Sequence, residues 1–150
     1  MQTYSNNDYI YSVDMMFSYI MLNKPKFTNI KVEELVEQLN YDGWGDPINN
    51  IKYSAIDVIN NPSKYKNEYD RIKKADLNYP IIISSDGYVV DGIHRLSNAY
   101  LNNVKTIKAY KFNDKIMKKF ILAKSNEWDK VDNIKSYNLI NLYASRFCKK

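Results

Sequence analysis

The sequence is poor in the residues that mark secreted or disordered chains. It has one cysteine, Cys148, so no internal disulfide can form, and we expect a reducing, cytoplasmic location. Glycine and proline number four each, and no repeat or low-complexity tract divides the 150 residues. With 45% hydrophobic and 26% charged residues, the composition favours one globular domain over residues 1–150.

Long hydrophobic runs are missing as well. The most apolar stretch, residues 9–22, is interrupted by Asp14 and is shorter than the roughly 20 residues that a bilayer requires. We therefore expect no transmembrane segment and interpret this stretch as a helix that is buried on most of its circumference. A lipid-facing or partner-facing surface is the alternative interpretation.

Basic residues are in excess, but they are dispersed. The chain has 22 basic and 17 acidic residues, and 19 of the basic ones are lysines spread along its length. Scattered lysines are typical of a solvated surface, so we expect at most weak, nonspecific binding to nucleic acid. Other basic types are rare: His94 is the sole histidine, and Arg95 is one of three arginines.

Hydrophobic periodicity predicts an α+β fold, in which helices surround a small mixed sheet. Strands are expected at residues 79–84, 87–90 and 105–112, and an Asp-Gly turn joins the first two as a hairpin. A short strand followed by a turn or a helical segment is expected at 51–62. Helices are expected at 9–22, 27–40, 66–77, 91–103, 113–125 and 133–147.

The helix that follows Asp91 has an apolar face formed by Ile93, Leu96, Ala99 and Tyr100. His94 and Arg95 point away from this face and lie in the first turn, which is the electropositive end of a helix. A cation at this end is disfavoured by about 0.3–1 kcal/mol, so Arg95 is expected to accompany a bound anion.

A phosphate would satisfy the groups gathered in this turn. The backbone N–H groups of Gly92 and Ile93, the guanidinium of Arg95 and the ring of His94 would hold it. Gly92 would let the backbone approach the ligand closely. Arg71 is a weaker candidate for the same role, since its interpretation as a solvated helix residue is the more favoured one.

Other interpretations of this turn stay open. Asp91 is the N-cap of the helix, a carboxylate that orients a substrate hydroxyl or binds Mg²⁺, or both. Arg95 could simply pair with Asp86 or Asp91 on the surface while His94 packs locally. Because this chain uses lysine for general charge, an arginine is more expected where planar, bidentate geometry matters.

Residues 79–110, YPIIISSDGYVVDGIHRLSNAYLNNVKTIKAY, resemble the core of the ParB/sulfiredoxin superfamily. In that superfamily a proline-started strand, a hairpin strand, a D-G-x-H-R turn and a helix form a nucleotide phosphate site. The resemblance covers residues 51–112, with 1–50 and 113–150 expected to be helical extensions. The turn at 91–95 is nearest to the D-G-H-H-R form of the free serine kinase branch. Ile93 stands where sulfiredoxins carry their reactive cysteine, so their chemistry is not expected here.

The resemblance implies a nucleotide-dependent phosphoryl-transfer enzyme, either a kinase or a phosphohydrolase. It would bind ATP or ADP, with CTP as an alternative, and act on a small hydroxyl compound or phosphoester. Asp91 and His94 would be catalytic, and Asp91 would also bind Mg²⁺. An acidic residue upstream would be the base, and Asp57, Glu68 and Asp70 are the candidates.

Two further functions are compatible with the resemblance. One is a non-enzymatic nucleotide-binding switch that uses the terminal helices to bind a partner. The other is a ParB-like nucleic-acid-binding or nuclease-like protein, against which the mild and dispersed charge argues. Oligomerisation is left open by the sequence.

Overall fold

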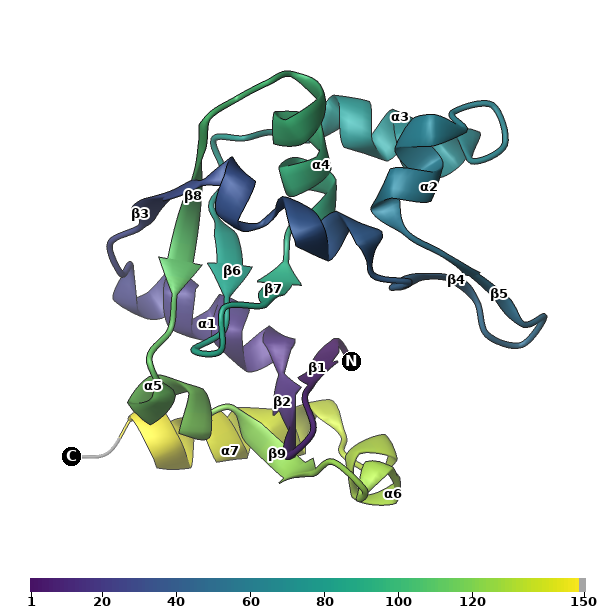
Figure 1. The fold of residues 1–150 in the computed structure, drawn as a ribbon. Coiled ribbons are helices and arrows are strands. Elements are labelled where there is room, and N and C mark those ends of the chain that lie inside the picture. The colour runs from purple at the N-terminus through teal and green to yellow at the C-terminus, as the bar shows by residue number, and fades with distance from the viewer. Residues whose placement is uncertain (149–150) are drawn as a thin grey trace. The chain divides into compact units, whose positions relative to one another are not determined.

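A computed structural model describes residues 1–148, which form two compact units (Figure 1). The terminal unit combines Met1–Pro25 with the chain from Phe112 onward, and the central unit is Lys26–Lys111. Helices and small sheets occur in both, so the chain is α+β, as predicted. The prediction of a single domain stays a prediction.

The central unit contains a mixed four-stranded sheet in the order β3-β8-β6-β7. Its strands are β3 (Thr28–Lys31), β6 (Ile81–Ile83), β7 (Val89–Asp91) and β8 (Thr106–Lys111). β6 and β8 are parallel, whereas the β6–β7 and β3–β8 pairs are antiparallel. The three strands expected in this region are therefore confirmed.

The prediction of a helix at 27–40 is wrong. Its first residues form β3, which pairs with β8, and the rest forms two 3₁₀ helices, Val32–Glu34 and Val36–Asn40. Val32, Leu35 and Leu39 are buried in the core of the central unit. A 3₁₀ helix also brings residues three apart to one side, so the apolar spacing alone did not distinguish it from an α-helix.

Three α-helices belong to the central unit: α2 (Ala55–Asn60), α3 (Lys66–Lys74) and α4 (Ile93–Leu101). Helix α4 connects β7 to β8 in the chain and packs on the sheet and on both 3₁₀ helices, while α2 and α3 pack against it (Figure 1). Leu96 and Ala99 are fully buried, as their spacing predicts, but Tyr100 is 43% exposed.

A two-stranded hairpin of β4 (Trp44–Asp46) and β5 (Ile51–Tyr53) extends away from the sheet of the central unit (Figure 1). Gly45 has φ of +130°, and a Cβ there would lie 2.1 Å from the carbonyl oxygen of Ile51. Only glycine fits this close pairing. Trp44 and Tyr53 are the cross-strand pair at the base of the hairpin.

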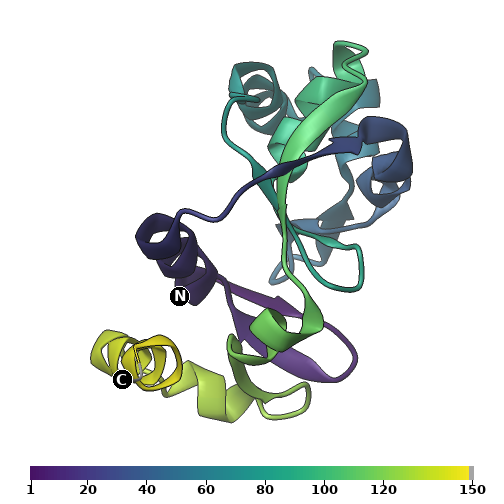
Figure 2. The ribbon, with the colours of Figure 1, turned by 90° about the vertical axis from the view of Figure 1, so that its left-hand side faces the viewer.

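The terminal unit has a three-stranded sheet in the order β1-β2-β9, with β1 (Thr3–Ser5), β2 (Tyr9–Ser12) and β9 (Ile121–Lys124). Its helices are α1 (Val13–Asn23), α5 (Asp114–Lys118), α6 (Trp128–Asp132) and α7 (Ser136–Phe147). Helices α1 and α7, both seen nearly end-on in Figure 2, touch through the rings of Tyr19 and Phe147, whose centroids lie 5.4 Å apart.

Two of the helices predicted in this unit are shorter than expected, because β2 and β9 pair with each other. Ser12 ends β2 and caps α1 by accepting a hydrogen bond from the Met15 N–H. Met21 and Leu22 of α1 are exposed, so this helix is buried on a smaller part of its circumference than expected. Within residues 1–148, no helix has the length and apolar character needed to cross a membrane.

Candidate functional site

The candidate site lies in the central unit, where α3 meets the first turn of α4. The two helices are joined by Asn98 of α4, whose Nδ2 donates to the carbonyl oxygens of Ile72 at 3.0 Å and Lys73 at 3.3 Å. These carbonyls are in the last turn of α3, where helix carbonyls lack the usual partner four residues on, and the Ile72 oxygen also accepts from the Ala75 N–H at 3.3 Å. The buried Asn98 therefore fixes one helix against the other.

Glu68 of α3 and His94 of α4 form a close polar pair that joins the two helices. His94 Nε2 lies 2.7 Å from Glu68 Oε2, and the side chains are 33% and 20% exposed. When Glu68 is ionised it can only accept, so the hydrogen of this bond is on the imidazole nitrogen. Arg71 Nη1 lies 3.6 Å from the other oxygen of Glu68. The pair is thus a carboxylate and an imidazole, both reachable from solvent.

Of the three acidic candidates, the structure brings Glu68 to His94. Asp57 forms a capping box at the start of α2: its Oδ2 accepts from the Ser54 N–H at 2.9 Å, and its own N–H donates to Ser54 Oγ at 3.2 Å. Asp70 is two residues beyond Glu68 on α3, so it projects from a different side of the helix.

Trp44 covers one face of the His94 ring. The two rings are stacked, with centroids 4.6 Å apart and an interplanar angle of 21°. The series continues from Trp44 to Tyr53, at 6.3 Å, and from Tyr53 to Tyr65, which stack at 4.4 Å. Stacking restricts rotation of the imidazole and so keeps Nε2 directed at Glu68. Sequence reasoning missed Trp44, whose only signal was an aromatic residue between two glycines.

Tyr53 lies in the electrostatic field of this pair. Burial raises the pKa of its phenol, the nearby charges of Glu68 and Tyr65 raise that pKa further, and Arg71 lowers it. Tyr53 therefore keeps its proton throughout the neutral range and is available as an O–H donor beside Glu68.

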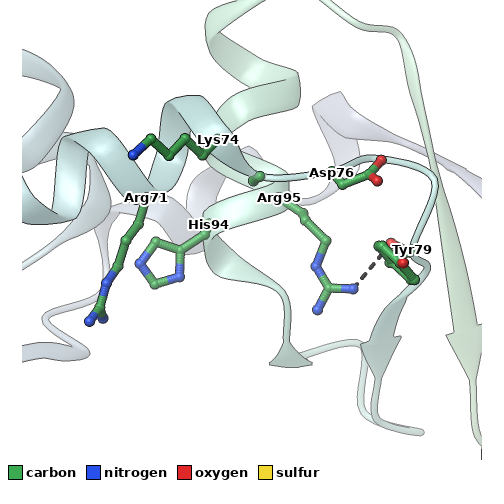
Figure 3. Close-up of a pocket in the computed structure, with 7 residues that line it drawn as sticks. Arg71, Lys74, Asp76, Tyr79, His94 and Arg95 are labelled. Carbon is green, nitrogen blue, oxygen red and sulfur yellow. Dashed lines mark hydrogen bonds between the residues drawn. The ribbon is translucent and has the colours of Figure 1, made fainter.

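Arg95 is engaged by the protein itself. Its Nη1 donates to the carbonyl oxygens of Tyr79 at 3.1 Å and Pro80 at 2.8 Å, and its Nη2 donates to Asp91 Oδ2 at 2.6 Å. Figure 3 shows its guanidinium turned toward Tyr79. Arg95 thus ties α4 to the entrance of β6 and the end of β7, and the surface pairing with Asp91 is the interpretation that the structure bears out. A phosphate at this guanidinium would have to replace some of these bonds.

Asp91 is not the cap of α4. It is the last residue of β7, the N-cap is Gly92, and no side chain caps the helix there. Gly92 has φ of +120°, and a Cβ would lie 2.3 Å from Cγ2 of Ile81. The glycine is therefore required by packing against β6, whether or not a ligand approaches. Ile93 packs partly buried against the core, so it can offer a ligand only its backbone N–H.

An open depression of about 530 Å³ lies between the end of α3 and the first turn of α4 (Figure 3). We call it the basic depression, and it is lined by Arg71, Lys74, Ala75, Asp76, Tyr79, His94 and Arg95. Its lining carries three cations against one carboxylate. Arg71 and Lys74 lie in the last turn of α3, where the helix dipole favours positive charge. A small anion is the class of ligand that this surface attracts.

The residues do not form a ready Mg²⁺ site. Asp91, the expected ligand, has its carboxylate bound by Arg95, which a metal ion would have to displace. In the part of the chain that the structure describes, no three side chains of His, Cys, Asp or Glu are grouped so as to hold a metal ion. Magnesium commonly binds through one or two carboxylates and the substrate phosphates.

Comparison with known proteins gives little further information. No family model matches the chain, and no solved structure does. A biosynthetic arginine decarboxylase from Prochlorococcus marinus (strain AS9601) is 29% identical over an alignment of 90 residues, and the match covers 55% of this chain. The match spans 14% of the length of that decarboxylase.

Proposed function

We propose that this chain is a nucleotide-dependent phosphoryl-transfer enzyme with a ParB/sulfiredoxin-like core. The observation that supports this most is the 2.7 Å contact between Glu68 and His94 at the edge of the basic depression. A carboxylate that can take a proton lies beside a surface that attracts phosphates, and phosphoryl transfer needs both. The donor is ATP, with ADP as its product, and CTP is the alternative nucleotide.

The nucleotide phosphates lie in the basic depression against Arg71, Lys74 and the free N–H groups of the first turn of α4. The two cations balance the charge on the equatorial oxygens of the γ-phosphoryl group, which is the main contribution that a protein makes to this reaction. Arg95 adds positive charge from its place beside Asp91 without giving up its bonds to the backbone.

In the transfer step, the hydroxyl oxygen of the acceptor bonds to the γ-phosphorus, and its proton passes to Glu68. The bond from that phosphorus to the β,γ-bridging oxygen breaks, and ADP leaves with the electron pair. Before the transfer, His94 donates a hydrogen bond from Nε2 to Glu68, and this bond holds the carboxylate in place. If water is the acceptor, the same step makes the protein a phosphohydrolase.

Thermal unfolding of the full chain with ATP, ADP, CTP or inorganic phosphate tests the binding half of this proposal. A ligand that binds only the folded state raises the melting temperature. We expect ATP to raise it for the wild type and for Lys73→Ala, a lysine of α3 outside the basic depression. Lys74→Ala and Arg71→Ala should lose most of the shift. If no nucleotide stabilises the wild type, the proposal is wrong, and if ATP binds but is never consumed, the switch replaces the enzyme.

A further inference from the structure

We infer that a second depression of the central unit binds the phosphoryl acceptor, and that this acceptor itself carries a phosphomonoester group, as a sugar phosphate does. The inference rests on the proposed function, because it names the second substrate. This acceptor depression encloses about 420 Å³ and is lined by Tyr53, Lys64, Tyr65, Lys66, Asn67, Glu68 and Arg71.

Glu68 connects the two depressions. It lines the acceptor depression and bonds to His94, which lines the basic depression, while Arg71 lines both. A hydroxyl in the acceptor depression can therefore reach Glu68 from one side while the nucleotide phosphates approach from the other. Transfer requires the base to lie beside the attacking oxygen, and this arrangement places it there.

The charge of the lining selects the chemical class of the acceptor. Lys64, Lys66 and Arg71 supply three positive charges, and Glu68 supplies one negative charge. A phosphomonoester carries about −1.5 to −2 at pH 7, which matches the surplus. An uncharged alcohol would leave the surplus unbalanced, and an amino acid would bring an ammonium group among the three cations.

Two tyrosines give this depression a fixed wall. The rings of Tyr53 and Tyr65 stack with their centroids 4.4 Å apart, and Lys64 Nζ lies 5.2 Å from the centre of the Tyr65 ring. The stack holds both phenols in place, and Tyr53 remains an O–H donor. With Asn67, the phenols provide the neutral hydrogen-bonding groups that the hydroxyls of a sugar phosphate require.

Isothermal titration calorimetry on the full chain tests the inference. The probes are ribose 5-phosphate, glucose 6-phosphate and glycerol 3-phosphate, each paired with its unphosphorylated counterpart. We expect at least one phosphorylated probe to bind while its counterpart does not. The double variant Lys64→Ala/Lys66→Ala should weaken that binding by about tenfold or more, the scale of losing a charged hydrogen bond.

Lys73→Ala is the matched control, because Lys73 also lies over a tyrosine ring, 5.7 Å from the centre of Tyr69, but lines neither depression. The affinity of Lys73→Ala for the phosphorylated probe should stay within about twofold of the wild-type value, a change too small to indicate a lost contact. The inference is overturned if no phosphorylated probe binds, if counterparts bind equally well, or if the double variant binds unchanged. ATP binding is measured in a separate titration. Failure of ATP to bind would contradict the proposed function, whereas failure of the phosphorylated probes to bind would contradict only the inference about the acceptor depression.

Discussion

His94 Nε2 and Glu68 Oε2 are 2.7 Å apart, although 26 positions separate the two residues in the chain. Asn98 brings their helices together by bonding the last carbonyls of α3. Trp44 stacks on the imidazole from the β4–β5 hairpin. The pair is thus supported by groups on both sides, which is the arrangement expected where the orientation of a side chain matters.

Trp44→Ala is expected to loosen the His94 ring without unfolding the chain. Because His94 is the only histidine, its ring protons give a single set of NMR signals. In the wild type, the ring current of the stacked indole should shift these signals from their ordinary frequencies. These signals should move toward free-histidine positions in Trp44→Ala and only part of the way in Trp44→Phe. Turnover should fall by about tenfold or more in Trp44→Ala, with recovery in Trp44→Phe. Unchanged signals in Trp44→Ala would show that the stack does not hold the ring.

Three glycines of the central unit form a graded series for stability. Gly92→Ala should destabilise by about 2–5 kcal/mol, because a Cβ at positive φ would also collide with Ile81. Gly87→Ala, with φ of +89° and open space, should cost about 1–2 kcal/mol. Gly43 has open space around it and no positive φ, so Gly43→Ala should change stability by less than about 0.5 kcal/mol. Urea unfolding measures all three, and equal values for Gly92→Ala and Gly87→Ala would contradict the packing account.

Arg95 and Asp91 should be energetically coupled. Removing Arg95 leaves two carbonyls and a carboxylate without their donor, so Arg95→Ala should cost about 1–3 kcal/mol. A double-mutant cycle with Asp91→Asn should give a coupling energy of about 0.5–2 kcal/mol. The cycle uses urea midpoints of the wild type, both single variants and the double variant. Additive effects would mean that the 2.6 Å contact contributes nothing to stability.

The raised pKa of Tyr53 predicts how Glu68 affects the alkaline limit of the fold. Burial is its largest cause and Glu68 comes next, so Glu68→Gln should lower this pKa. Because the folded-state value is raised, the stabilisation is complete below the ordinary tyrosine value of 10.0 and is lost as pH rises through the raised value. In Glu68→Gln this loss should therefore be smaller and should be complete at a lower pH, because the folded-state pKa lies closer to the unfolded value. Titration of ¹³C-labelled tyrosines, with Tyr53→Phe to assign the signal, would reveal an unchanged pKa if the two groups do not interact.

Much of the central unit could be predicted from the sequence. The strands at Ile81–Ile83 and Thr106–Lys111 follow from short apolar runs beside turns, and helix α4 follows from its 3.6-residue period. In the terminal unit, strands β2 and β9 were absorbed into predicted helices. Their pairing joins segments more than a hundred residues apart, and no local pattern reports such a partner.

The candidate site was predictable in part. Scarcity of histidine and arginine singled out His94 and Arg95, but the bonds of Arg95 to Tyr79 and Pro80 depend on where β6 begins in space. Glu68 and Asp57 are equally acidic in the sequence, and only the approach of α3 to α4 distinguishes them. Nothing in the local sequence indicated the role of Asn98, because the carbonyls that it bonds belong to another helix.

Phosphoryl transfer at the Glu68–His94 pair is tested most directly by following ATP with ³¹P NMR in the presence of a phosphorylated acceptor. The account predicts that the wild type converts ATP to ADP and that Glu68→Gln reduces turnover by about 100-fold or more while still binding ATP. Asp57→Asn, which alters a helix cap outside the pair, should keep turnover near the wild-type value. No consumption of nucleotide by the wild type, or equal turnover in Glu68→Gln, would contradict the account.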